Sequence, residues 1–340
     1  MTAPNSPTVI TDGNALNSDS EPGARGLSGA RGLSERQPLL LAGLGAATIS
    51  CSPVLVVLSG ASAVSTAFYR SAIALPVLVA LAAIEQRRRG SRSLRQRLMA
   101  GSAGVFLAVD LILWTHSIAD IGAGVATVLG NLQVLIVAGI SWLLWHERPS
   151  RAVIVAIPVV MTGVVLVSGL VGKSATGQHP VAGVMYGLAT AVAYSGFLMV
   201  LRRASADSPH VAGPVAESTA GATAASLVAG FLLGGLGLHP LWPSIGWLIV
   251  LGLVSQVAGW LLITSSLPKL PAAISSLMLV LQPAASLIIA AIVIDERPTL
   301  LQIFGAGLTC CGALAASLAA TRTPASKPRP AVPETLAQEL

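Results

Sequence analysis

Three ionisable side chains interrupt long apolar stretches of this sequence, namely Arg70, Asp110 and Glu217. A charge in apolar surroundings is costly, so such a residue usually faces a polar cavity or a partner. A carboxylate such as Asp110 or Glu217 can also load and release a proton when its surroundings change. These residue types therefore indicate a solute pathway and a route for proton coupling.

Arg70 and Asp110 are predicted to lie at similar depths in neighbouring helices. Arg70 stands about seven residues into its apolar run, or roughly 10 Å along a helix. One interpretation places both side chains in a solute pathway. The other is a structural ion pair that locks two helices together, and a less favoured one lets Arg70 extend outward to the surface. The residues alone leave the first two open.

An internal repeat relates two distant parts of the chain. The pairs at one constant spacing are Gln133 with Gln282, Glu147 with Glu296, Pro149 with Pro298, and Gly163 with Gly312. Each segment has Leu-Gln near its start, followed by an apolar run and then by Glu-Arg-Pro. Self-similarity of this kind predicts two copies of one structural unit.

Gln133 and Gln282 are the equivalent polar residues of the two copies. If both face inward, they offer amide donors and acceptors from opposite sides of one cavity, which suits a zwitterion or another polar solute. The alternative is a hydrogen bond between helices. We favour cavity lining, because both glutamines stand beside Asn131 or Pro283, where regular packing breaks.

Glu217 stands at the repeat position close to that of Arg70, but near the opposite surface. It is predicted either to carry a proton during transport or to be a solvated residue of a vestibule. Further polar or aromatic lining is predicted from Asn131, Trp114, Tyr194, Gln256 and Trp260. For Trp114, which stands near a helix end, an anchor at the membrane interface is the favoured interpretation.

The composition requires that these residues be positioned by membrane helices. Hydrophobic residues make up 54% of the 340 residues and charged residues only 10%, and the mean hydropathy is +0.77. The apolar stretches are about 20 residues long, the length at which a helix crosses a bilayer. The predicted fold is therefore an all-α integral membrane protein with ten transmembrane helices arranged as two inverted five-helix repeats, which cover residues 38–171 and 181–320.

Turn residues and charges set the predicted span boundaries. Residues 1–37 and 321–340 are rich in polar, glycine or proline residues and are predicted to be disordered tails. The ten predicted spans are 38–58, 63–84, 98–118, 121–144, 151–171, 181–201, 212–235, 244–264, 271–294 and 300–320.

The arginines and lysines predict the orientation in the cell membrane. With both termini in the cytoplasm, only Lys173 and Arg297 fall in outer loops, as the positive-inside rule requires. Because each repeat has five spans, an odd number, the second copy is inverted with respect to the first. Such an arrangement permits alternating access to a site near the middle of the membrane.

Several other classes of function are not favoured by the sequence. Cys51, Cys310 and Cys311 stand in apolar runs, and the histidines lack metal-site spacing, so neither a disulfide framework nor a metal site is predicted. Gly172-Lys173-Ser174 lacks the first glycine of a phosphate loop. We expect no cofactor and no nucleic-acid partner, with the basic charge explained by cytoplasmic loops. The expected partners are a small-molecule solute and the lipid bilayer.

The repeat resembles that of a known family. Leu281-Gln282-Pro283 and Asp295-Glu296-Arg297-Pro298, with the related first copy, resemble the EamA-type carriers of the drug/metabolite transporter superfamily. The first copy departs from the pattern, since Val134 stands where the family usually has proline. Arg70 resembles an arginine that the family often carries in its second helix. The resemblance covers residues 38–320 and implies export of amino acids or other small metabolites, and some relatives carry nucleotide-sugars or lipid-linked sugars.

The leading hypothesis is thus a secondary transporter that exports small polar or amphipathic metabolites by alternating access, with proton coupling. An integral-membrane enzyme, or a flippase, acting on lipid-linked substrates is the alternative. An enzyme would need clustered acids, bases or metal ligands at one membrane face, whereas the charged residues here are spread over several helices. A sensor or scaffold would make the inverted repeat unnecessary.

Overall fold

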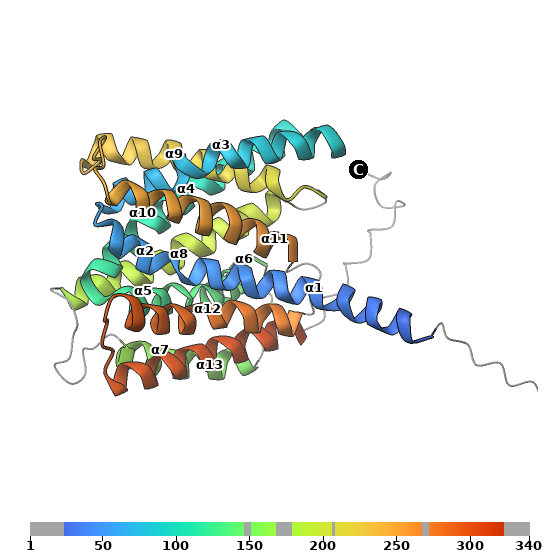
Figure 1. The fold of residues 1–340 in the computed structure, drawn as a ribbon. Helices are drawn as coiled ribbons and strands as arrows, with labels where there is room; N and C mark the ends of the chain where they lie inside the picture. The colour runs from blue at the N-terminus through green and yellow to red at the C-terminus, as the bar shows by residue number, and fades with distance from the viewer. Residues whose placement is uncertain (1–23, 146–150, 168–178, 206–207, 267–271, 323–340) are drawn as a thin grey trace, which may run out of the picture. The chain divides into compact units, whose positions relative to one another are not determined.

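The computed structural model describes residues 24–145, 151–167, 179–205, 208–266 and 272–322, and its regular elements there are helical (Figure 1). In chain order they are α1 (Ala24–Ser50), α2 (Ser52–Ser59), α3 (Ala63–Arg89), α4 (Leu94–Ile121), α5 (Ala123–Gly130), α6 (Gln133–Trp145), α7 (Arg151–Val167), α8 (Pro180–Ala204), α9 (Ala212–Leu233), α10 (Ser244–Val250), the π-helix η1 (Leu251–Gly259), α11 (Trp260–Ser266), α12 (Ala272–Val293) and α13 (Leu300–Arg322).

The chain divides into two compact units, Met1–Gln37 and Pro38–Leu340. In the first unit, residues 24–37 are helical, although a disordered tail is predicted there, and residues 1–23 lie outside the described residues.

Within the described ranges, six helical stretches are long and apolar enough to cross a membrane, and they match the predicted spans 1, 2, 3, 6, 7 and 8. The other four predicted spans coincide with shorter apolar helices, Ala123–Val137, Ile154–Leu166, Gln282–Val293 and Leu300–Ala315. The described residues are thus helical and contain six candidate spans, while the number of ten stays a prediction.

Three predicted spans are interrupted near their middle. The first span breaks at Cys51, and Pro53 follows within the first turn of α2, where its missing N–H costs no helical hydrogen bond. The fourth breaks at Asn131, between α5 and α6, and the eighth contains the π-helix η1. Such irregularities free backbone groups and redirect side chains, and they are frequent at functional sites.

The equivalent helices α3 and α9 pack closely and run antiparallel. The hydroxyl of Ser65, at the start of α3, donates a hydrogen bond to the carbonyl of Gly235, which follows α9 (3.1 Å). At the other end, Arg92, which follows α3, pairs with Glu217 near the start of α9. We call the end that contains Arg87–Arg97 the arginine-rich end and the other the opposite end.

Small residues permit close packing between the two copies of the repeat. A Cβ on Gly104 of α4 would collide with the backbone of α9 at Ser218, and a Cβ on Gly221 would collide with Gly101. The α7 and α13 helices lie side by side (Figure 1), with Gly312 against Val160. The buried apolar core forms two clusters, one centred on α5 and one shared by α3, α4, α8 and α9.

Candidate functional site

A cavity of about 100 Å³ lies between helices of both repeats. Its walls come from α1 and α2, α3, α4, α5, α8, α11 and α12. It is lined by Ile49, Ser52, Pro53, Arg70, Leu107, Asp110, Leu111, Trp114, Thr127, Gly130, Asn131, Thr190, Tyr194, Trp260, Gln282 and Ser286. The fold therefore brings together seven of the site residues predicted from the sequence around one cavity, namely Arg70, Asp110, Trp114, Asn131, Tyr194, Trp260 and Gln282.

Arg70 is held rigidly at the wall of this cavity. The side chain is buried, with 5% of the residue exposed. Its Nε donates to Gln256 Oε1 (2.9 Å) and its Nη1 donates to Ser52 Oγ (3.0 Å). Gln256 in turn donates to the Thr219 hydroxyl (3.2 Å). Four spans thus orient one guanidinium group, and Gln256 lies behind Arg70 rather than on the cavity wall.

Gln256→Leu should weaken transport by misplacing Arg70. The change removes one hydrogen bond to a charged group, worth roughly 1.5–3 kcal/mol, so we expect about a tenfold or larger loss of transport at low solute concentration. The measurement is the dependence of transport rate on solute concentration, in which a raised KM would show misplacement. Gln86→Leu, on the exposed face of α3, is the control. Unchanged kinetics of the Gln256 variant would contradict the positioning role.

Asp110 stands in the same cavity without pairing with Arg70. It is buried, and among the described residues no ion pair or hydrogen bond to its carboxylate is found. The ion pair considered from the sequence is not among the ion pairs of the described residues, and the hydrogen bonds of the guanidinium go to Ser52 and Gln256. The cavity wall therefore carries both a guanidinium group and a carboxyl group.

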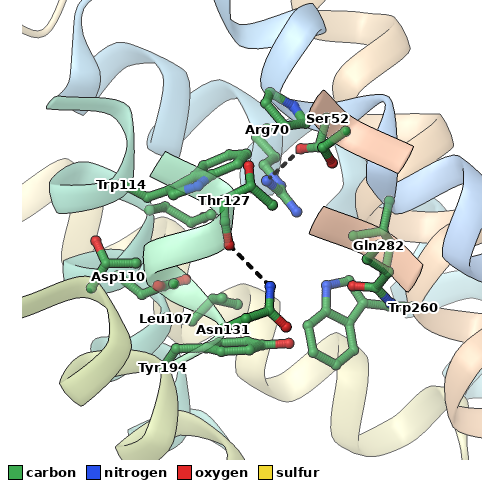
Figure 2. Close-up of a pocket in the computed structure, with 16 residues that line it drawn as sticks. Ser52, Arg70, Leu107, Asp110, Trp114, Thr127, Asn131, Tyr194, Trp260 and Gln282 are labelled. Atoms are coloured by element: carbon green, nitrogen blue, oxygen red, sulfur yellow. Dashed lines mark hydrogen bonds between the residues drawn. The ribbon is translucent and has the colours of Figure 1, made fainter. Parts of the chain in front are cut away.

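Aromatic side chains form a wall beside these charges. Tyr194 and Trp260 meet edge to face, with ring centroids 6.4 Å apart, and Phe197 packs behind both at 5.9 and 5.3 Å. Figure 2 shows Asn131 beside Tyr194 and Trp260, with its amide donating to the Thr127 carbonyl (3.0 Å). Trp114 also lines the cavity and is therefore not only an interfacial anchor.

The two equivalent glutamines are not placed alike. Gln282 lines the cavity, whereas Gln133 is buried, with 6% exposure, and does not. The reason is the break after α5: Gln133 begins a new helix, α6, while α12 continues through Pro283. Gln133 instead adjoins α8, where its carbonyl accepts a hydrogen bond from Ser195 (3.4 Å). The expected facing pair is thus reduced to Gln282.

Glu217 belongs to an ion-pair network at the arginine-rich end and not to the cavity. Its Oε2 pairs with Arg92 Nη1, and its Oε1 lies 3.3 Å from Arg97 Nε. Arg92 also donates to the carbonyl of Ala204 (2.7 Å). The network connects the start of α4, in the first repeat, to α8 and α9, in the second repeat.

Glu296 makes a comparable contact at the opposite end. Its Oε2 accepts a hydrogen bond from the N–H of Gly124, in the first turn of α5 (3.2 Å). A side chain at Gly122 would collide with the same carboxylate. Burial raises the pKa of Glu296 above its usual value of 4.5, and hydrogen bonds from Gly124 and Ala123 oppose that shift. A carboxylate at a helix N-terminus also interacts favourably with the helix dipole.

Glu296→Gln should remove a pH dependence of stability. Because the folded-state pKa lies above 4.5, the folded protein binds this proton more tightly than the unfolded chain does. This tighter proton binding stabilises the folded protein fully at pH values below 4.5, and the stabilisation is lost as the pH rises through the folded-state pKa. The Tm of the parent, relative to the variant, should therefore fall as the pH rises from about 4.5 through the folded-state pKa of Glu296. Asp295→Asn, at an exposed neighbour, should keep the parent's slope, and equal slopes in all three proteins would refute the assignment.

Several lining residues escaped the sequence interpretation, namely Ser52, Thr127, Thr190 and Ser286. Helical spacing could have found three of them, since Thr127, Thr190 and Ser286 each stand four residues from a predicted lining residue and so share its helix face. Ser52 had no such signal, because its position depends on the helix break. Among the described residues, no group of three or more His, Cys, Asp or Glu could hold a metal ion.

Comparison with known proteins agrees with this architecture. A model described as the EamA-like transporter family matches residues 38–169 and 181–318. A solved structure, titled only as the crystal structure of a protein, is similar with a TM-score of 0.56 and 18% sequence identity over 85% of this chain and 99% of that chain. No curated protein matches. The solved structure supports the fold alone, whereas the family model covers most of both halves of the sequence. With two copies of the family's repeat around a shared cavity, this chain belongs to the EamA-like transporter family.

Proposed function

We propose that this protein is a secondary transporter that exports small amphipathic zwitterions, such as amino acids, by alternating access of its two repeats. The observation that carries the proposal is the pair Arg70 and Asp110, which stand in one cavity without forming an ion pair with each other. A zwitterion places a carboxylate and an ammonium group on one small molecule, and this cavity offers a partner for each. Membership of a transporter family favours transport over an enzymatic reaction.

The remaining wall suits an amphipathic solute of small size. Tyr194, Trp260 and Trp114 offer apolar faces, and Asn131 and Gln282 offer amide groups. A volume of about 100 Å³ is well below the roughly 300–1,000 Å³ of sites for drug-sized ligands. Size and polarity together favour a metabolite with few heavy atoms.

The antiparallel pairing of α3 and α9 supports the inverted arrangement of the repeats. Separate contacts link the two halves at each end. The arginine-rich end has the Glu217 network, and the opposite end has hydrogen bonds such as Tyr69 Oη to the Gly237 carbonyl (3.0 Å). If these contacts form and break alternately, the cavity opens to one side at a time. The arginine-rich end would face the cytoplasm under the positive-inside rule.

Proton coupling would run through Asp110. Of the two carboxylates considered from the sequence, it is the one on the cavity wall, where it is exposed to each side in turn as the cavity alternates. Glu217 is paired with Arg92 and Arg97 and does not line the cavity, so it lacks the alternating exposure that we propose for Asp110.

The test is an untargeted metabolite profile of the medium around cells that overproduce the parent protein. Cells with Arg70→Gln and cells with Arg203→Gln, at equal membrane levels, serve as the site variant and the matched surface control. We expect a small set of zwitterionic solutes to rise with the parent and with Arg203→Gln but not with Arg70→Gln. Identical profiles from the three strains would overturn the proposal.

A further inference from the structure

A second cavity, of about 400 Å³, opens at the arginine-rich end between α3, the start of α9, and α11. Its residues are Leu81, Ile84, Glu85, Arg88, Arg89, Val211, Ala212, Leu261, Leu262 and Ser265. We call it the α3–α11 groove. It does not share a residue with the central cavity, so it is a separate feature of the surface.

The walls of the groove are apolar and belong to membrane spans. Leu81 and Ile84 come from the span Ala63–Arg89, and Leu261 and Leu262 come from the span Ser244–Ser266. Ile84 is 49% exposed, so this part of the wall is open to the surroundings of the helix bundle. Arg88 and Arg89 stand in the last turn of α3 and also line the groove. With the arginine-rich end in the cytoplasm, the positive-inside rule would place these two arginines among the lipid headgroups.

The arginines at the mouth of the groove differ in their partners. Arg89 lies 3.5 Å from Glu85 and donates to the Pro209 carbonyl. Glu85 is further occupied by the N–H groups of Val211 (2.8 Å) and Gly213 (3.0 Å) at the start of α9. Within the part of the chain that the structure describes, Arg88 has neither an ion pair nor a hydrogen bond. Its guanidinium is thus available to an anion at the groove.

We propose that the α3–α11 groove binds an anionic phospholipid, with the phosphate on Arg88 and an acyl chain between the two pairs of leucine and isoleucine side chains. Charge complementarity selects the occupant: a guanidinium binds phosphate in a planar, two-pronged geometry, and the cluster Arg87–Arg97 attracts an anionic headgroup. The apolar wall favours a lipid over a free anion. Because lipid tails gain little from burial in a membrane, the headgroup charge decides which lipid is retained.

The occupant would contact both repeats, since α3 belongs to the first and α9 and α11 to the second. A lipid bound there would stabilise one relative position of the two halves. The site therefore links the composition of the membrane to the conformation of the protein. This inference does not depend on the solute assigned to the central cavity.

The experiment uses the full chain in nanodiscs that contain equal amounts of phosphatidylcholine and phosphatidylglycerol. The protein is released into detergent, and the retained lipid is identified by native mass spectrometry. Arg88→Gln tests the headgroup contact, and Ser265→Phe tests the groove by filling it. Arg95→Gln is the matched control, since it removes a charge from the same cluster but does not line the groove.

We expect the parent and Arg95→Gln to retain one phosphatidylglycerol, and Arg88→Gln to lower that retention about fivefold, the effect of one arginine near an anionic surface. Ser265→Phe should lower it as well. Equal retention by Arg88→Gln and Arg95→Gln would show a diffuse surface attraction and overturn the site. Retention of phosphatidylcholine to the same degree as phosphatidylglycerol would also overturn the site. Full displacement of phosphatidylglycerol by inorganic phosphate would overturn it as well, because that result would indicate a site for a free anion. If Arg88→Gln does not fold, Ser265→Phe decides in the same assay.

Discussion

Replacing Arg70 by glutamine should reduce transport about 100-fold. Arg70 makes charge-assisted hydrogen bonds to Gln256 and Ser52 and is the cation on the cavity wall that can meet a solute carboxylate. Loss of a charged hydrogen bond to the solute costs roughly 1.5–3 kcal/mol, and each 1.4 kcal/mol corresponds to about a factor of ten in rate. The shorter neutral side chain also leaves Gln256 without its donor.

The measurement is solute uptake or efflux by reconstituted vesicles at low solute concentration. Arg70→Lys keeps the charge but cannot preserve both hydrogen bonds, so we expect an intermediate loss of about tenfold. Arg203→Gln, at the exposed end of α8, should behave as the parent. A fully active Arg70→Gln protein would remove Arg70 from the solute site.

Replacing Asp110 by asparagine should separate transport from the proton gradient. Asp110 is the carboxylate on the cavity wall, and it forms no ion pair among the described residues. Asparagine has nearly the same shape but cannot carry a proton. We expect transport driven by a pH gradient to fall at least about tenfold, whereas exchange of solute across the membrane without a gradient should fall less, because only the ammonium contact is weakened.

Glu217→Gln is the paired control for Asp110→Asn. Glu217 is held by Arg92 and Arg97, so neutralising it should lower the free energy of unfolding by about 2 kcal/mol and leave the coupling intact. The two variants are compared for gradient-driven transport, exchange and Tm in the same vesicles. The assignment of the coupling group is wrong if the Asp110→Asn protein still accumulates solute when a pH gradient is the driving force. It is also wrong if only Glu217→Gln loses this coupling.

Some features of the structure could be predicted from the sequence, and others could not. The membrane class and the positions of the long helices were predictable, because hydropathy and turn residues act locally along the chain. The repeat was equally visible, and the EamA-like family match confirms it at residues 38–169 and 181–318. Arg70 and Asp110 were conspicuous for the same reason, as a charge in an apolar run is informative without any knowledge of its neighbours.

The partners of those charges were not predictable. Arg70 and Gln256 are 186 residues apart in the chain, and no local pattern indicates that η1 brings the amide to the guanidinium. Glu217 likewise pairs with Arg92, 125 residues earlier, at a helix end that the sequence identified only as basic. An ion pair between Arg70 and Asp110 was equally consistent with the residue types.

The two glutamines show the same limit most plainly. Their equivalent places in the repeat favoured equivalent roles, yet the break after Gly130 turns Gln133 towards α8, while the continuous α12 leaves Gln282 on the cavity wall. The sequence by itself determined that this protein is a helical membrane protein with a duplicated unit and ionisable groups inside it. Only the tertiary structure decided which of these groups share a cavity and which act as contacts between helices, because side-chain partners depend on how distant helices pack and where their axes break.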